Sequence, residues 1–134
     1  MSDSELAVVA AQTFPAPILI ERAGPSTRKK FFEFFTVPIR NANTRAAYYR
    51  AIQQFLAWAE RAGYQDLEDI EPITVAAYIE ILQRQAAPPT VKQHMAAIRM
   101  LFSWLTIYAD LRLDYKLATL PSEYPQRRRW CRLH

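Results

Sequence analysis

The sequence contains very little glycine and cysteine. Only Gly24 and Gly63 occur among 134 residues, which disfavours many-turned β folds and Gly-rich phosphate loops, because both need backbone positions with positive φ. The single Cys131 cannot form a disulfide within the chain, which agrees with a reducing compartment. There is no run of about 18 apolar residues, and the first residues are acidic where a signal peptide would be basic. We therefore expect a soluble, cytoplasmic protein.

Apolar residues are plentiful. Hydrophobic residues make up 51% of the chain and charged residues 22%, and three Trp, seven Tyr and seven Phe supply large side chains for a core. A chain of this length is typical of one domain.

Charge is distributed unevenly along the chain. Residues 28–50 carry six bases and one acid, residues 51–89 carry two bases and six acids, and residues 110–134 carry six bases and three acids. Basic segments thus flank an acidic middle, which favours a polyanionic partner. The charge pattern alone is equally compatible with an ordinary solvated surface.

The part of the sequence in which apolar residues recur at helical spacing begins at residue 28. In residues 28–38 the phenylalanines at 31, 34 and 35 predict a helix that Pro38 ends. Asn41 and Asn43 are both suited to cap the next helix, which spans residues 44–62 and stops before Gly63. Its apolar stripe comprises Tyr48, Ile52, Phe55, Leu56 and Ala59.

Two further helices follow an acidic loop. Pro72 is suited to open a helix that reaches about residue 85, with a buried side made of Val75, Tyr78, Ile79 and Leu82. Thr90 can cap the last helix, whose stripe consists of Val91, Met95, Ile98, Phe102 and Leu105. These patterns predict an all-α fold, a compact four-helix bundle over residues 28–109.

The two ends of the chain show no sustained period. Residues 1–27 contain three prolines, and residues 110–134 contain two prolines and a basic Arg-Arg-Arg-Trp-Cys-Arg cluster. We therefore expect irregular N- and C-terminal tails.

Several motifs occur in a specific order. Asn-Thr-Arg at 43–45 is followed by Phe-x-x-Trp-Ala at 55–59 and by Gly63, then by Ile73, Thr74 and Tyr78, and finally by a helix from Thr90 to Leu105 that contains Arg99 and Phe102. This order resembles the SAM-like, N-terminal core-binding domain of the tyrosine recombinases, the phage-integrase family. The resemblance covers residues 28–109.

The resemblance implies binding to double-stranded DNA through the second and fourth helices of the bundle. In that family the domain lies across one face of the duplex, while a separate catalytic domain closes from the other. The residues implied to contact DNA are Arg28, Lys29, Lys30, Asn43, Thr44, Arg45, Thr90, Lys92, Gln93 and Arg99. Backbone amides at helix N-termini and side-chain hydroxyls can donate hydrogen bonds to phosphate oxygens, and Lys and Arg neutralise the phosphate charge. The Gln93 amide can both donate to and accept from the edge of an adenine base.

Other roles stay open for many of these side chains. Asn43 and Thr44 are compatible with simple helix caps, and Lys92 and Arg99 with solubilising cations. His94 is as compatible with a solvated boundary position as with a phosphate contact. Packing is favoured over base stacking for the large aromatic residues Tyr48, Tyr49, Trp58 and Trp104.

The chemistry of the resembled family depends on groups that this sequence lacks. Those enzymes use a tyrosine nucleophile with arginines, lysine and histidine, including a His-x-x-Arg element, and no His-x-x-Arg occurs here. Tyr115 and Tyr124 therefore have no activating site. We expect no catalytic residues and no enzyme activity. We further expect that the chain is a fragment produced by truncation or a frameshift near Asp110, and that it associates with the nucleoid.

No cofactor, metal, membrane or small-molecule substrate is expected, and Cys131 with His134 offers too few ligands for zinc. Two alternatives to DNA binding remain: a protein-interaction module that pairs with intact integrase subunits, and a non-functional remnant.

Overall fold

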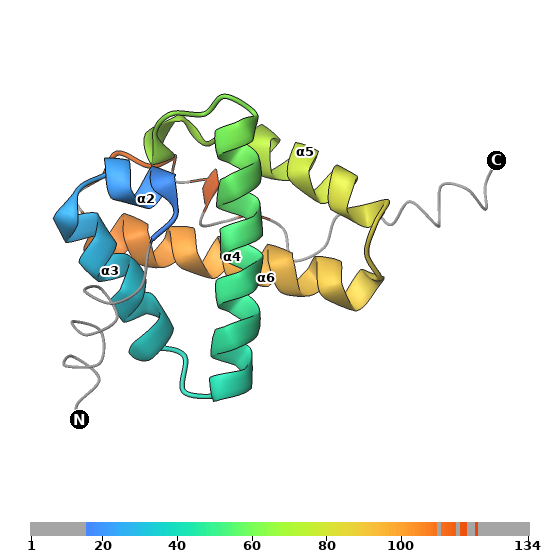
Figure 1. The fold of residues 1–134 in the computed structure, drawn as a ribbon, viewed down its shortest axis with the longest axis horizontal. Coiled ribbons are helices and arrows are strands. Elements are labelled where there is room, and N and C mark those ends of the chain that lie inside the picture. The colour runs from blue at the N-terminus through green and yellow to red at the C-terminus, as the bar shows by residue number, and fades with distance from the viewer. Residues whose placement is uncertain (1–15, 110, 115, 118–119, 121–134) are drawn as a thin grey trace.

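The computed structural model describes residues 16–109, 111–114, 116–117 and 120 (Figure 1). Over these residues the chain forms five α-helices and no strand. Their order is α2 (Ile18–Arg22), α3 (Pro25–Thr36), α4 (Ala42–Arg61), the short 3-10 turn η1 (Leu67–Asp69), α5 (Pro72–Gln83) and α6 (Pro88–Tyr108). The predicted all-α fold is confirmed, and the four expected helices correspond to α3, α4, α5 and α6.

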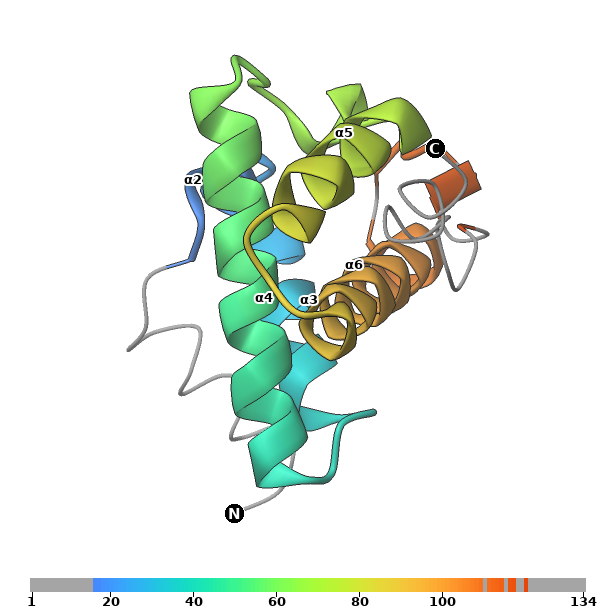
Figure 2. The ribbon, with the colours of Figure 1, turned by 90° about the vertical axis from the view of Figure 1, so that its right-hand side faces the viewer.

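The core is built where α4 and α6 cross (Figures 1 and 2). The predicted stripe of α6 is buried at every position, and that of α4 is buried except for the half-buried Tyr48. Phe55 of α4 lies edge-on to Phe102 of α6, with 6.3 Å between the ring centroids. Each such side chain contributes about 1.5–3 kcal/mol by leaving water, so this crossing contributes strongly to the stability of the domain.

Local sequence signals fix the C-terminus of α4 and the N-terminus of α5. Gly63 has a φ of +103°, and the Tyr64 amide donates to the Ala59 carbonyl at 3.1 Å, which is the bond expected when a helix stops at a left-handed glycine. Pro72 opens α5 as predicted, and Glu71 and Thr74 form a reciprocal capping box at its start.

The N-terminal part of the chain is more ordered than the sequence suggests. The expected irregular tail up to residue 27 is wrong for residues 18–27, because α2 precedes α3 and α3 begins at Pro25. Leu19 and Ile20 of α2 are fully buried in the common core. With only two buried aliphatic side chains, α2 is too short for a helical period to be visible in the sequence.

The chain after α6 also packs on the core where the structure describes it. Leu117 and Leu120 are buried, and the Arg112 amide donates to Glu68 Oε1 at 3.2 Å. The described residues after α6 form no regular helix or strand beyond a short turn, as expected for an irregular segment, but they pack on the bundle, which the sequence did not reveal. The basic cluster at 127–132, Tyr115, Tyr124 and the Cys131/His134 pair lie outside the described residues.

Candidate nucleic-acid interface

The N-terminus of α4 is shaped by Asn41. Its side-chain oxygen accepts hydrogen bonds from the backbone amides of Asn43 at 2.9 Å and Thr44 at 3.1 Å. Asn41 is thus the cap, and the alternative that Asn43 and Thr44 serve as caps is wrong. The Asn43 side chain is exposed and that of Thr44 is half-buried. Because Asn41 already satisfies two amides, any contact to phosphate here would come mainly from side chains.

Arg45 folds back over the turn that precedes α4. Its Nη2 donates to the Ile39 carbonyl at 3.1 Å, and its Nε is buried without a hydrogen-bond partner. The guanidinium therefore ties the first turn of α4 to the end of the loop from α3. This contact holds the α4 N-terminus in place. It also uses one donor of the guanidinium that the sequence analysis expected to contact DNA.

The N-terminus of α6 has few amides to offer an anion. Its first two residues, Pro88 and Pro89, have no N–H, and the Thr90 amide donates to the Ala87 carbonyl at 3.0 Å. Ala87 occupies the cap position, so the prediction that Thr90 caps this helix is wrong. The side chains of Thr90, Lys92 and Gln93 are exposed.

Helical spacing groups further cations with these residues. Arg99 lies two turns after Lys92 and therefore on the same side of α6, where it lines a groove with Pro38 of the turn that leads into α4. Arg50 is exposed and lies two turns after Asn43 on α4, and the exposed Arg40 immediately precedes Asn41. The sequence analysis did not single out Arg40 and Arg50, although the seven-residue spacing from Asn43 would have revealed Arg50.

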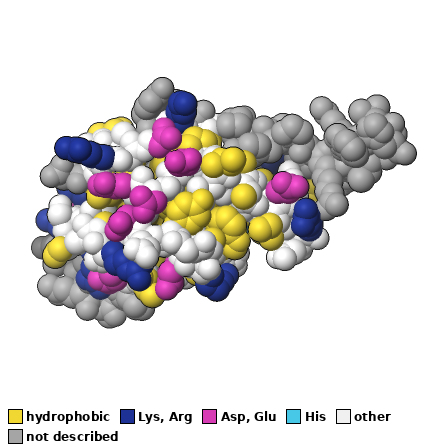
Figure 3. Space-filling model, turned by 90° about the horizontal axis from the view of Figure 1, so that it is seen from above, with side chains coloured by type: hydrophobic (Ala, Val, Ile, Leu, Met, Phe, Trp, Pro, Cys, Tyr) yellow, Lys and Arg dark blue, Asp and Glu magenta, His cyan; other side chains and the backbone are white. Residues whose placement is uncertain are grey.

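Acidic and basic residues separate along α4. No Asp or Glu occurs between Glu33 and Glu60 or between Glu80 and Asp110, so α6 has no acidic residue and α4 has one near its C-terminus. The acidic loop before α5 lies at the other end of α4, at the top of Figure 1, and Figure 3 shows acidic side chains on that end. A helix of this length separates the two ends by about 30 Å.

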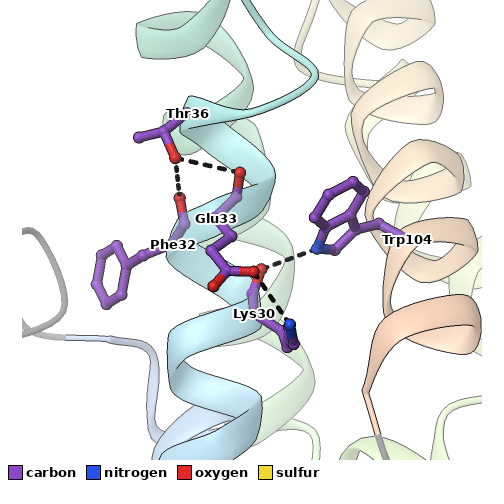
Figure 4. A network of polar contacts seen from close by, with 5 residues as sticks. All are labelled: Lys30, Phe32, Glu33, Thr36 and Trp104. Carbon is purple, nitrogen blue, oxygen red and sulfur yellow. Dashed lines mark hydrogen bonds and ion pairs between the residues drawn. The ribbon is translucent and has the colours of Figure 1, made fainter. Parts of the chain in front are cut away.

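The basic run at the start of α3 does not form a free cationic patch. Arg28 Nε pairs with Glu21 at 2.8 Å and its guanidinium lies over the Phe32 ring. Lys30 Nζ pairs with Glu33 at 3.2 Å, and its carbonyl accepts from Trp104 Nε1 at 2.9 Å (Figure 4). Lys29 is exposed. The Arg28 side chain thus joins α3 to α2, and the Lys30 side chain pairs with a neighbour within α3.

His94 is not at the surface. It is only 5% exposed, and its Nδ1 lies 3.0 Å from the Tyr78 hydroxyl of α5. Burial lowers the pKa of His94 and raises the pKa of Tyr78 to about 12, so both groups are neutral near pH 7. The expectations of a solvated histidine or a phosphate contact are therefore wrong.

The large aromatic side chains belong to the core. Tyr48, Tyr49, Trp58 and Trp104 pack against the buried cluster, which confirms the packing interpretation. Over the described part of the chain, no group of three potential metal ligands lies together. None of the described helices combines the length and the apolar character needed to cross a membrane.

Comparison with known families places part of this chain in a described family. The family described as phage integrase, N-terminal SAM-like domain, matches residues 28–108, which include α4, α5 and α6 and most of α3. No curated protein sequence and no solved structure matches the chain.

Proposed function

The chain belongs to the phage-integrase family through its N-terminal SAM-like domain, and from this premise we propose that residues 28–108 bind double-stranded DNA in the context of site-specific recombination. The observation that most supports this is the charge of α4 and α6. Arg45 and Arg50 of α4, Arg40 of the loop before it, and Lys92 and Arg99 of α6 lie in stretches without an acidic residue. A duplex presents one negative charge per about 1.7 Å of its axis, so such a surface binds it with release of counterions.

The proposed contacts divide by chemistry. Lys92, Arg99 and the newly recognised Arg50 neutralise phosphates, and Asn43 donates to phosphate oxygens from the start of α4. Gln93 is exposed beside Lys92, where its amide can pair with an adenine edge in the major groove.

The remaining predicted residues have secondary roles in this proposal. Thr44 and Thr90 add hydroxyl contacts to phosphate at the two helix starts. Arg45 positions the α4 N-terminus through its bond to the Ile39 carbonyl. Lys29 adds a peripheral backbone contact, whereas Arg28 and Lys30 are largely neutralised by their acidic partners.

We propose binding without strand cleavage for these 134 residues. The sequence contains no His-x-x-Arg element, and phosphoryl transfer to a tyrosine requires cations and proton donors around the reacting phosphate. A single domain that contacts one face of the duplex should bind DNA weakly. We propose that this binding takes place in the cytoplasm, at the nucleoid.

Fluorescence anisotropy with a labelled duplex, titrated over a range of salt concentrations, tests the proposal. About four to six phosphate contacts predict a slope of log K against log salt of about −4 to −5. Lys92→Ala and Arg99→Ala should each reduce the steepness by about 0.9. Arg84→Ala is the matched control, because Arg84 follows α5 and pairs with Glu80.

Three outcomes of this titration are informative. A control variant with the same loss as Lys92→Ala would contradict the assigned surface. Arg45→Ala should weaken binding with little change in slope if its role is positional. No binding at low salt by a chain that is helical by circular dichroism would refute DNA binding.

Pairing with other integrase subunits is a second candidate, favoured by the outer side of α5. Ile73 is 71% exposed and Ile81, two turns later, is 38% exposed, and exposed apolar surface of this kind is typical of interaction sites. Sedimentation velocity tests it: self-association at micromolar concentration that Ile73→Asp abolishes would support pairing through α5. A monomer at every concentration would argue against self-pairing.

A further inference from the structure

A groove of about 310 Å³ lies between the end of α3 and the second half of α6. Phe34 of α3 and Pro38 of the following turn form one wall, and α6 forms the other. Most of the lining is apolar or aromatic. Pockets for small organic ligands have this character and begin at about 300 Å³, so the groove is large enough for one flat ring.

The α6 wall combines polar and aromatic side chains in a regular arrangement. Residues four apart on a helix lie one above the other, so the lining residues form two rows, one of Arg99, Ser103 and Ile107 and one of Met100, Trp104 and Tyr108. The first row begins with a cation and a hydroxyl group, and the second ends with two aromatic rings. One to two helical turns, about 5–11 Å, separate the polar part from the aromatic part.

The aromatic part of the groove is fixed in place yet open to solvent. Trp104 Nε1 donates to the Lys30 carbonyl of α3 at 2.9 Å (Figure 4), and the centroids of the Trp104 and Tyr108 rings are 4.2 Å apart. Trp104 itself packs against the core, whereas Tyr108 is 51% exposed. Tyr108 is therefore a supported aromatic ring on which a planar ligand can stack.

The charge of the groove favours a ligand that is both anionic and aromatic. Arg99 is the charged residue among the described residues that line it, and no acidic residue occurs between Glu80 and Asp110. An aliphatic partner would match the apolar lining but would offer nothing to the guanidinium. A nucleotide matches both parts, because it joins a phosphate to a flat ring that stacks on aromatic side chains.

The groove also borders the surface that we propose to bind DNA. Arg99 belongs to both, and Pro38 lies in the turn that leads to the start of α4. A strand whose phosphate is held by Arg99 therefore passes the opening of the groove. A base that is paired and stacked in a duplex cannot enter such a slot, whereas an unpaired base can rotate out of the helix at much lower cost.

We propose that the groove between α3 and α6 binds one unpaired base of a DNA strand, with the base stacked on Tyr108 and its phosphate held by Arg99 and Ser103. This site rests on the proposed function, because it extends a surface that binds the duplex, and Arg99 keeps its phosphate contact. Every base has a π-face, so the groove accepts unpaired bases with little regard to their identity.

Fluorescence anisotropy of the full-length chain with two labelled duplexes tests this. One duplex is fully paired, and the other is identical except for one extra, unpaired 2-aminopurine in one strand. We expect the bulged duplex to bind at least about fivefold more tightly, and the 2-aminopurine fluorescence to fall as the base stacks. Equal affinity for the two duplexes would overturn the proposal while leaving duplex binding intact. No binding to either would refute DNA binding, and this site with it.

Variants separate the groove from the flexibility of bulged DNA. Tyr108→Ala should abolish the preference and the fluorescence change without altering the salt slope for the paired duplex, whereas Tyr108→Phe should keep both. Ile73→Ala is the matched control, because it shortens an exposed apolar side chain on α5. A preference that persists in Tyr108→Ala would show that the bulge acts through DNA bending, which overturns the proposal.

Sedimentation velocity of the same variants covers the other occupant of an apolar groove, a second copy of the chain. We expect wild type and Tyr108→Ala to sediment alike. Self-association that Tyr108→Ala abolishes, together with equal affinity for the two duplexes, would assign the groove to a second copy and overturn the proposal.

Discussion

Replacing Asn41 with alanine removes the side-chain oxygen that accepts two backbone amides at the start of α4. We expect this single change to destabilise the domain by about 1–2 kcal/mol, because the Asn43 and Thr44 amides lose a well-placed acceptor. N-cap substitutions cost about 0.5–2 kcal/mol in general. The two short bonds to one oxygen place Asn41 in the upper part of that range.

The expected change in melting temperature follows from the size of the domain. For domains of about 100 residues, 1 kcal/mol corresponds to about 4–8 °C in Tm, so Asn41→Ala should lower Tm by several degrees. Fraying of the first turn of α4 should also weaken DNA binding, because Asn43 and Thr44 would lose their fixed positions.

Asn43→Ala is the matched control, with the same substitution two residues further along. The Asn43 side chain is exposed, and alanine is the better helix former, so stability should change by less than about 0.5 kcal/mol. DNA binding should nevertheless weaken, because the proposed phosphate contact is lost.

Urea denaturation and anisotropy on the two variants measure both effects. Loss of stability in Asn41→Ala together with loss of binding at unchanged stability in Asn43→Ala would support the assigned roles. If Asn43→Ala destabilises the domain as much as Asn41→Ala, the cap has been misassigned and the reasoning is refuted.

Three further changes test the packing. Burial lowers the pKa of His94 from its ordinary value of 6.5, so the unfolded chain takes up the proton first on acidification. Stability should fall as the pH drops below about 6.5, and a His94→Gln variant that keeps the same pH dependence in urea titrations would contradict this. Leu19→Ala should cost about 2–5 kcal/mol if α2 belongs to the domain; a cost near zero in the same assay would exclude it. Trp104→Phe removes the hydrogen bond that Trp104 Nε1 donates to the Lys30 carbonyl and should cost about 0.5–1.5 kcal/mol, whereas an unchanged urea midpoint would show that this bond contributes little.

The sequence was sufficient to predict the four helices α3 to α6 and the buried sides of α4 and α6, but not α2. Apolar residues at helical spacing identify the buried sides of α4 and α6 because a helix turns by a fixed angle per residue. Gly63 and Pro72 mark helix ends through their own backbone geometry. Such signals act within a few residues, so they are readable before the fold is known.

The roles of individual polar residues were decided by tertiary structure. Asn41 and Asn43 look alike in the sequence, and only the backbone path after α3 determines which one meets the free amides of α4. Arg45 appears as a free cation until the loop brings the Ile39 carbonyl within 3.1 Å. His94 becomes buried because Tyr78, from another helix, covers it. The contact between Tyr78 and His94 depends on how two helices pack, and the contacts of Asn41 and Arg45 depend on the backbone path of the loop before α4.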